Sequence, residues 1–232
     1  MPDPHPGDKT GRKAYNPRYP EAGCHRSRLR ASNPLDDKTF ETGLMERIRA
    51  GDKSACAECI EIHSPGIYRL ALRLMRNEAD AEEVVQETFL SAFKGIDRFD
   101  GRSGLRTWLF RIAYNAAMMR LRRGKPEEVS VEDAADPEAG APVPQALFAW
   151  RDLPEEELGK AEVREVLERA IRELPEKLRT VFVMRELEEL STGETAAALE
   201  ISEDVVKTRL HRARLSLREQ LAGFFAPQAE GE

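Results

Sequence analysis

The chain has 232 residues, of which 41% are hydrophobic, 6% aromatic and 34% charged, and its formal net charge is -6. This length corresponds to one or two domains of about 100–200 residues each, and the prevalence of Leu, Ala, Glu and Arg favours an all-helical fold. No apolar run is long enough to cross a bilayer and the N-terminus lacks the apolar core of a secretory signal, so we expect a cytoplasmic protein with no membrane insertion.

The acidic average conceals an uneven distribution of charge along the chain. Residues 101–126 contain seven Lys and Arg and no Asp or Glu, whereas residues 127–157 contain ten acidic residues and a single Arg. Because local fields decide where a polyanion docks, the negative net charge does not exclude nucleic acid as a partner.

The N-terminal half is expected to hold a disordered arm followed by one helical bundle. Residues 1–36 are rich in Pro, Gly and Arg and show no apolar periodicity, which is typical of disorder. Within residues 37–123 the periodicity predicts five helices, running from near Phe40 to Gly51, from Lys53 to His63, from Ile67 to Met75, from Asn77 to Phe93 and from Leu105 to Arg123. Ser64-Pro65-Gly66 is expected to end the second helix, and Asn77 or Asp80 to cap the fourth.

The C-terminal half is expected to be a flexible linker followed by a second, smaller bundle. Residues 124–158 combine five prolines with the acidic run, which indicates a linker. Apolar periodicity over residues 159–224 predicts helices before and after Pro175, with a short disordered tail at 225–232.

The end of this second bundle has the pattern of a helix-turn-helix. Residues 190–199 and 205–214 predict two short helices joined by a tight turn, with Ala196, Ala197 and Leu199 as the packing face of the first. The cations of the second helix would face outward, where they could meet phosphates and base edges of duplex DNA. A solvated basic helix in a small bundle has the same pattern, so this segment alone leaves both interpretations open.

Two cysteines and a histidine have a spacing that could hold a metal or form a redox pair. Cys56, Cys59 and His63 fall on one predicted helix, and the remaining cysteine, Cys24, lies in the predicted arm. Because no fourth ligand is evident and free cysteine packs well as a small hydrophobe, we expect core packing and no metal. A redox or zinc-linked role is the alternative.

Three segments together resemble the extracytoplasmic-function (ECF) group of bacterial sigma-70 factors. Residues 80–90, DAEEVVQETFL, are similar to the family's polymerase-binding segment, and residues 107–115, TWLFRIAYN, to its −10 reading segment. The helix-turn-helix is similar to the family's −35 domain. The resemblance extends from about Phe40 to Leu221, with the segments in the family's order.

The resemblance assigns roles to particular residues. The positions that match polymerase contacts are Asp80, Glu83, Gln86 and Glu87. The positions that match contacts with the −10 element are Phe99, Arg106, Arg111, Asn115, Arg120, Arg122 and Arg123. The positions that match contacts with the −35 element are Lys207, Thr208, His211, Arg212 and Arg214.

The residue types suit these roles. Glu83, Gln86 and Glu87 share one helix face, which could pair with cations of a partner helix. Asn115 offers both a donor and an acceptor to a base edge, and an aromatic side chain such as Phe99 can stabilise an unstacked base. For Trp108 we expect a core anchor instead of a stacking platform.

Three features, at four positions, depart from the family pattern. Glu200 occupies the turn of the helix-turn-helix where the family usually has Gly, so it is expected in a left-handed conformation at some cost. Thr195 replaces the usual Ile, and Met118-Met119 stands where a polar residue often follows Asn115. The last departure affects the expected −10 preference.

The resemblance implies a transcription initiation factor that is not an enzyme and uses no cofactor. Its expected partners are core RNA polymerase, at the clamp of the largest subunit and at the flap, promoter DNA, and an anti-sigma factor. Two rivals are a helix-turn-helix regulator with an N-terminal sensor bundle and an enzyme. Residues 83–87 and 107–115 argue against the sensor, and the sequence offers no catalytic constellation to an enzyme.

Overall fold

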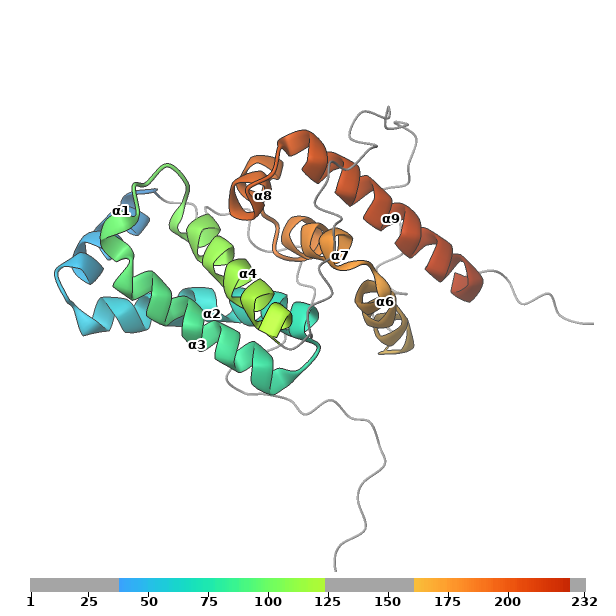
Figure 1. The fold of residues 1–232 in the computed structure, drawn as a ribbon, viewed down its shortest axis with the longest axis horizontal. Coiled ribbons are helices and arrows are strands. Elements are labelled where there is room, and N and C mark those ends of the chain that lie inside the picture. The colour runs from blue at the N-terminus through green and yellow to red at the C-terminus, as the bar shows by residue number, and fades with distance from the viewer. Residues whose placement is uncertain (1–37, 124–160, 226–232) are drawn as a thin grey trace, which may run out of the picture.

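The computed structural model describes residues 38–123 and 161–225, and these residues form helices and connecting turns without a strand. The N-terminal bundle consists of α1 (Lys38–Arg49), α2 (Lys53–Met75), α3 (Glu78–Lys94), a 3-10 turn η2 (Ile96–Arg98) and α4 (Leu105–Arg123). The C-terminal bundle consists of α6 (Ala161–Glu173), α7 (Glu176–Phe182), a π-helical turn η4 (Val183–Leu187), α8 (Thr192–Leu199) and α9 (Glu203–Phe225). The all-helical expectation with two bundles is confirmed (Figure 1).

The predicted arm at 1–36, the linker at 124–158 and residues 226–232 of the tail lie outside the described residues. Among the helices that are described, none is long and apolar enough to span a membrane.

Helix α2 is continuous through Pro65, so the prediction of two separate helices there was wrong. Cys59 and His63 before the proline and Ile67 and Leu70 after it are all buried on one side of the helix. An interior proline costs about 3 kcal/mol, but burying a large apolar side chain contributes about 1.5–3 kcal/mol. Packing on both sides of Pro65 therefore keeps the helix in one piece, and the described N-terminal bundle has four α-helices instead of five.

The ends of α3 and α4 follow local signals together with one long-range contact. Asn77 is the N-cap of α3, with its side-chain oxygen accepting from the Asp80 backbone N–H at 3.0 Å, as expected from the sequence. The first turn of α4 is capped from a distance, because the Leu105 N–H donates to Glu41 Oε2 of α1 at 3.2 Å. The negative charge of this carboxylate also stabilises α4, because the N-terminus of a helix is the positive end of its dipole.

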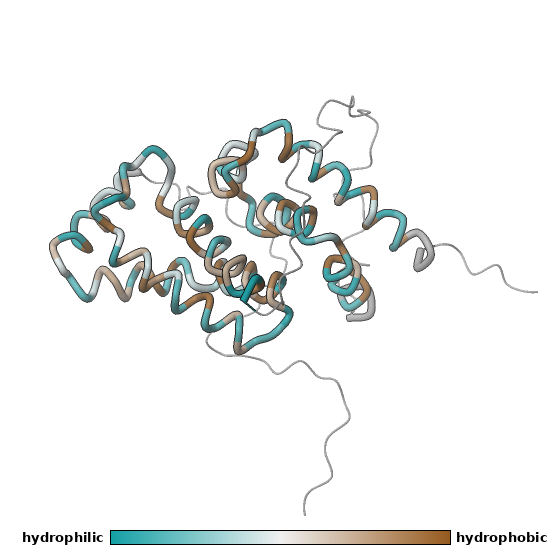
Figure 2. The backbone as a smooth tube through the Cα atoms, in the orientation of Figure 1, coloured by the Kyte–Doolittle hydropathy of each residue, from teal (hydrophilic) through white to brown (hydrophobic). Residues whose placement is uncertain are grey.

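Helix α4 packs against both α2 and α3. Leu109, Phe110 and Ala113 are buried on its inner side, and Figure 2 shows the apolar positions of α3 and α4 turned toward each other. The bounds predicted for this helix, Leu105 to Arg123, are confirmed.

The C-terminal bundle differs from the prediction in helix length and in packing face. The second helix of the helix-turn-helix is α9, which has 23 residues and is not short. In α8 the buried residues are Thr195, Ala196 and Ala198, whereas Ala197 is exposed. A capping box between Ser191 and Glu194 begins α8, which fixes its phase relative to the core.

The two bundles pack directly on each other. Helix α8 lies along α4, and α7 contacts α2 (Figure 1). The outer side of α4 is therefore partly covered by helices that follow it by many residues in sequence.

Candidate functional site

Helix α3 presents the predicted polymerase-contacting residues on its outer side. Glu83, Gln86 and Glu87 are exposed and Asp80 is half-buried, while Val84, Val85, Thr88 and Phe89 of the same helix are buried. Leu90 lies one turn after Gln86 and Glu87 and keeps 60% of its surface exposed. The structure thus brings these four residues together and adds a large apolar side chain that the sequence did not single out.

Arg120 of α4 is bound to this acidic face. Its Nε donates to Asp80 Oδ1 at 2.8 Å, and its Nη1 lies 2.5 Å from Glu83 Oε2. The hydrogen bond to Asp80 and the charge of Glu83 raise the pKa of Arg120. This residue, assigned from sequence to the −10 element, therefore orients two carboxylates of α3.

A second stripe follows the exposed side of α4. Arg111, Asn115 and Met119 recur every four residues and are all exposed, and Arg122 and Arg123 continue the stripe at the C-terminal end. Met119 is 50% exposed, whereas Met118 packs against the core. Of the two methionines that depart from the family pattern, only Met119 shares a face with Asn115.

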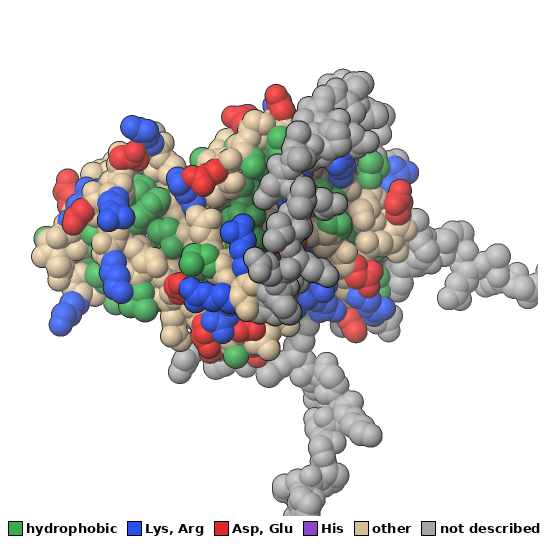
Figure 3. Space-filling view, in the orientation of Figure 1, with side chains coloured by type: hydrophobic (Ala, Val, Ile, Leu, Met, Phe, Trp, Pro, Cys, Tyr) green, Lys and Arg blue, Asp and Glu red, His purple; other side chains and the backbone are tan. Residues whose placement is uncertain are grey.

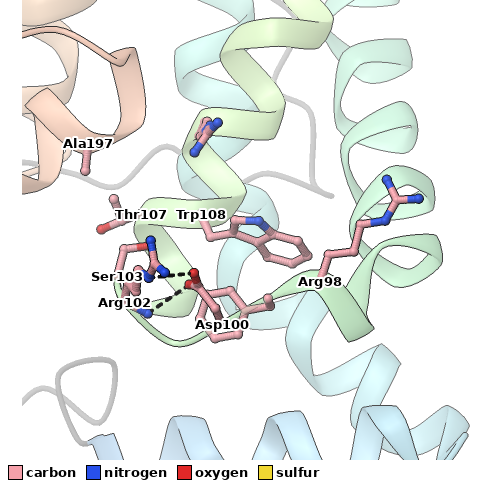
Figure 4. A pocket seen from close by; sticks show the side chains of 9 residues that line it. Arg98, Asp100, Arg102, Ser103, Thr107, Trp108 and Ala197 are labelled. Carbon is pink, nitrogen blue, oxygen red and sulfur yellow. Dashed lines mark hydrogen bonds and ion pairs between the residues drawn. The ribbon is translucent and has the colours of Figure 1, made fainter.

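Beside this stripe the surface is hollowed. The hollow has a volume of about 300 Å³ and is lined by the loop over residues 98–103, by Thr107, Trp108 and Arg111 of α4, and by Ala197 of α8. Figure 4 shows Thr107, Trp108 and Ala197 around it, with Asp100 and Arg102 joined across the loop at 3.0 Å.

Aromatic rings form one wall of the hollow. The rings of Phe99 and Trp108 lie 5.1 Å apart between centroids and are tilted by 50°. Arg49 of α1 holds the loop by donating to the Phe99 carbonyl at 2.7 Å. Trp108 is half-buried and packs against the core, as we expected for a core anchor. The same side chain also lines the hollow.

The N-terminal end of α4 contacts the C-terminal bundle. Arg106 donates to the Glu188 backbone carbonyl, Thr107 Oγ1 to Glu194 Oε1 at 3.4 Å, and Arg111 to the Glu200 carboxylate. Two of the predicted −10 cations, Arg106 and Arg111, are therefore engaged by the chain's own C-terminal bundle.

The carboxylate of Glu188 is fully buried where the bundles meet, and sequence reasoning missed it. Arg69 of α2 grips it with two hydrogen bonds of 2.7 Å each, and Arg106 Nη2 lies 4.0 Å away. Arg69 and Glu188 are 119 residues apart, so no local pattern in the sequence points to the pair.

The predicted −35 residues lie along the first half of α9. Lys207 is exposed and pairs with Asp204 at 3.0 Å, whereas Thr208, His211 and Arg212 are half-buried. Arg214 reaches back to Glu186 of η4 at 2.5 Å. On the face shown in Figure 3, Lys and Arg side chains are interspersed with Asp and Glu side chains.

The turn before α9 has the conformation expected from its sequence. Glu200 has φ 55° and ψ 40°, which is the left-handed region.

Glu194 at the start of α8 is partly buried, which opposes ionisation, yet hydrogen bonds from Ser191 and the charge of Arg106 keep its pKa below the ordinary value.

The cysteine and histidine side chains of α2 are packed in the core. Burial raises the pKa of Cys59 to about 12, and Cys56 is half-buried. Burial, together with the charge of Arg106, lowers the pKa of His63 to about 4, so its ring is neutral at pH 7. Residues 38–123 and 161–225 contain no group of three His, Cys, Asp or Glu arranged to hold a metal ion.

Comparison with known proteins matches these elements to one family. The sigma-70 region 2 model matches residues 59–127, which include α3 and α4, and the sigma-70 region 4 model matches residues 164–217. The ECF RNA polymerase sigma factor SigW of Bacillus subtilis is 36% identical over 177 residues, 76% of this chain and 94% of the relative. This chain belongs to the ECF sigma factors of the sigma-70 family.

Other comparisons of this sigma factor agree. The ECF RNA polymerase sigma-E factor of Escherichia coli K12 is 33% identical over 184 residues, 78% of this chain and 93% of the relative. Two solved structures share the fold at 24% identity. CnrH in complex with the cytosolic domain of CnrY has a TM-score of 0.54 over 79% of this chain and 97% of that chain, and the sigma factor RpoE in complex with the anti-sigma factor NepR from Bartonella quintana has 0.51 over 71% and 95%.

Membership in this family excludes the alternative of a helix-turn-helix regulator with an N-terminal sensor bundle. As a sigma factor, this protein binds RNA polymerase and directs it to promoters.

Proposed function

We propose that this sigma factor docks on core RNA polymerase through the outer side of α3, with Asp80, Glu83, Gln86 and Glu87 meeting cations of the clamp of the largest subunit. The observation that carries the proposal is the arrangement of this side. Leu90 continues the exposed side one turn after Gln86 and Glu87, and its 60% exposure is unusual for a large apolar residue in a helix packed on a core. An exposed apolar side chain next to charged and polar groups is typical of a protein interface.

Two substitutions test this docking. Glu87→Lys reverses a charge on this side of α3, and Leu90→Ala removes the exposed apolar side chain without changing charge. Each is expected to weaken binding of labelled core polymerase about ten-fold or more, since interface anchors contribute about 2 kcal/mol or more. The control is Glu61→Lys, the same reversal at an exposed position of α2. Normal polymerase binding by both α3 variants would refute the assignment.

At the −10 element, α4 and the loop before it are proposed to separate and hold the non-template strand. Support comes from the exposed stripe of Arg111, Asn115, Arg122 and Arg123 beside the hollow walled by Phe99 and Trp108. Aromatic rings offset the cost of unstacking a base, which is a few kcal/mol. The arginines would contact phosphates and make affinity fall with salt.

Helix α9 is proposed to enter the major groove at the −35 element. Lys207, Thr208, His211, Arg212 and Arg214 lie along its first half, and α8 would cross the backbone as the first helix of the motif does. We also propose that the C-terminal domain, residues 159–224, contacts the polymerase flap and that residues 37–123 form the other domain. Alanine at Lys207 and Arg212 should weaken only those promoters that depend on a −35 element.

The protein is proposed to work in the cytoplasm under the control of an anti-sigma factor and to make or break no bonds. The solved relatives named above are complexes of CnrH with CnrY and of RpoE with the anti-sigma factor NepR, which supports this mode of control. Run-off transcription with core polymerase on fragmented genomic DNA tests the whole proposal. Discrete starts that require this chain are expected, and their absence would overturn it.

A further inference from the structure

The loop between η2 and α4, residues 99–104, is tied at both ends to α1. Helix α1 contacts η2 as well as α2, and two of its side chains, those of Glu41 and Arg49, reach the loop. They are eight positions apart, which corresponds to about 12 Å along a helix at about 1.5 Å per residue. This span allows one helix to hold the beginning and the end of one loop.

Glu41 holds the end of the loop. Gly104 directly precedes α4 and its carbonyl accepts the Trp108 N–H at 3.1 Å, which is the position of an N-cap. An N-cap residue usually supplies a side-chain oxygen to the first turn, but glycine has no side chain. Glu41 supplies this oxygen instead, because its Oε2 accepts the Leu105 N–H at 3.2 Å. A Cβ at Gly104 would lie 3.5 and 3.6 Å from the two carboxylate oxygens, so Glu41 lies directly against the glycine.

Arg49 holds the beginning of the loop. Its Nη2 donates to the Phe99 carbonyl at 2.7 Å, and the Phe99 N–H bonds the Ile96 carbonyl at 3.2 Å where η2 ends. Both backbone polar groups of Phe99 are thus engaged, which fixes the part of the backbone that carries its ring. This ring lies 5.1 Å from that of Trp108 and forms a wall of the hollow. Arg49 therefore acts on the hollow through Phe99.

Between these two ties the loop is held by local contacts at the surface. The Arg102 N–H donates to Asp100 Oδ1 at 3.1 Å, and the two side chains form the ion pair drawn in Figure 4. The Arg102 side chain is 89% exposed and that of Asp100 is 58% exposed, and such exposed pairs contribute little. The shape of the loop therefore depends mainly on its ties to α1.

A loop that already has its working shape lowers the cost of separating the strands. Ordering a residue costs conformational entropy. If the loop became ordered only when DNA arrived, this cost would add to that of unstacking a base. A loop held in advance by α1 does not add it.

Resting on the proposed function, we propose that Glu41 and Arg49 are positioning residues for promoter opening. They hold residues 99–104 in the shape that receives an unpaired base, and they act through Phe99 and the start of α4 instead of through contacts with DNA. The charge of Glu41 separates this role from a simple electrostatic one. Removing an anion beside DNA would by itself favour DNA binding, whereas losing the tie disfavours opening.

The first test measures the loop in the full chain without polymerase. Trp150, the second tryptophan of the chain, is replaced by Phe so that fluorescence reports Trp108 alone. Glu41→Ala and Arg49→Ala are each expected to raise the acrylamide quenching constant of Trp108 about two-fold, because a loosened loop opens locally. Circular dichroism selects variants with wild-type helix content.

The controls are Glu46→Ala and Arg47→Ala, at two other exposed positions of α1. Arg47 bonds Asp52 and Glu58, at the start of α2. Both control variants should show the quenching of the parent protein.

The second test measures opening by the holoenzyme. The probe is a duplex promoter fragment from a start site that run-off transcription identifies, with 2-aminopurine in the non-template strand of the −10 element. Varying the holoenzyme concentration separates the affinity for the closed promoter from the rate of opening. We expect an unchanged affinity and a rate about ten-fold lower in Glu41→Ala and in Arg49→Ala, since the ordering cost then falls on the opening step. Glu41→Gln and Arg49→Lys keep an acceptor and a donor, and should open within about three-fold of wild type.

The double variant Arg49→Ala, Phe99→Ala identifies the route of the effect. If Arg49 acts through Phe99, the double variant opens as slowly as Phe99→Ala alone, because two changes to one contact do not add. Effects that multiply would give Arg49 a separate role, such as a direct contact with phosphate, and would overturn the positioning role.

Two further results would overturn the proposal. Unchanged quenching of Trp108 in both alanine variants would show that α1 does not hold the loop. Faster opening by Glu41→Ala would leave Glu41 only as a repulsive charge. Failure of the proposed function is distinguishable, because Phe99→Ala would then open as fast as wild type while Trp108 quenching still responded to the α1 variants, and the positioning role would fall with it.

Discussion

Arg120 of α4 and Asp80 of α3 are joined by a hydrogen bond of 2.8 Å from Nε to Oδ1 and a second contact of 2.7 Å from Nη2. A guanidinium assigned from sequence to DNA is thereby bound to a carboxylate assigned to polymerase. The two proposed interfaces meet at this pair.

Arg120→Ala is therefore expected to weaken polymerase binding as well as DNA binding. Without the guanidinium, Asp80 and Glu83 lose the group that orients them on α3. A competition assay for core polymerase at low and high salt measures the effect, which should shrink with salt because the pairs are partly exposed. Arg123→Ala serves as the control at the end of the same helix, and equal polymerase binding by the two variants would contradict the link.

Thr195→Val is expected to stabilise the C-terminal bundle by about 1 kcal/mol. Thr195 is fully buried and its hydroxyl has no hydrogen-bond partner among the described residues, so an apolar isostere relieves a desolvation cost of about 1–3 kcal/mol. Urea unfolding measures the change. The matched control is Thr180→Val, where a buried hydroxyl that donates to the Glu176 carbonyl at 2.8 Å is lost, and this variant should be destabilised by about 1 kcal/mol.

Glu200→Gly is expected to stabilise the helix-turn-helix by about 1 kcal/mol, because glycine adopts the left-handed conformation without the penalty of a Cβ. The ion pair with Arg111 that is lost is exposed and contributes little. Glu200→Gln removes the same charge but keeps the penalty. Equal thermal midpoints for the two variants would show that φ at this position costs nothing.

Stability is expected to fall as the pH drops below 6.5 because His63 is buried in its neutral form. Its pKa is about 4 in the folded protein and 6.5 ordinarily, so below pH 6.5 the unfolded chain binds a proton that the folded chain does not. The contribution of neutral His63 to the free energy of unfolding is fully present above pH 6.5 and declines by about 2 kcal/mol down to pH 5. Urea unfolding at pH 7 and pH 5 measures the slope, which His63→Gln should reduce.

The acidic residues whose pKa values are lowered do not account for the change in stability between pH 7 and pH 5. Asp52 has a pKa of about 2, set first by hydrogen bonds from Ser54, and Glu194 also titrates below its ordinary 4.5. Their stabilising contributions are lost only as the pH falls below those ordinary values. A slope between pH 7 and 5 that survives in His63→Gln would mean that another group carries it.

Alkylation is expected to distinguish the two cysteines of α2. Burial holds Cys59 as a thiol with a pKa of about 12, and the thiolate is the reactive form. At pH 8, iodoacetamide should label Cys56 in the native protein and Cys59 only in urea, as read by mass spectrometry of the peptides. Rapid native labelling of Cys59 would revive the redox alternative.

The local features of this protein could be predicted from sequence because their causes lie within a few residues. The bounds of α4 follow from its periodicity, the Asn77 cap from one side chain and one turn, and the left-handed Glu200 from its place between two helices. The acidic side of α3 follows in the same way from the spacing of Glu83 and Glu87 along one helix.

Pro65 marks the limit of this local reasoning. A proline followed by glycine predicts a break, but residues on both sides of it pack into one core, and their burial outweighs one missing hydrogen bond. The roles of long side chains were likewise out of reach. Arg120 was assigned to DNA, and only the packing of α3 on α4 placed it within 2.8 Å of a residue 40 positions away.

The sequence by itself determined the all-helical class, the bounds of α4, the exposed acidic and basic stripes and the resemblance to the family. The tertiary structure alone decided which charges meet: Arg69 with Glu188 across 119 residues, and Arg111 with Glu200 across 89. The reason is physical, since helix periodicity is a property of neighbouring residues, whereas an ion pair depends on how two separate bundles are oriented. That orientation is set by packing over the whole contact, including the absent side chain of Gly66.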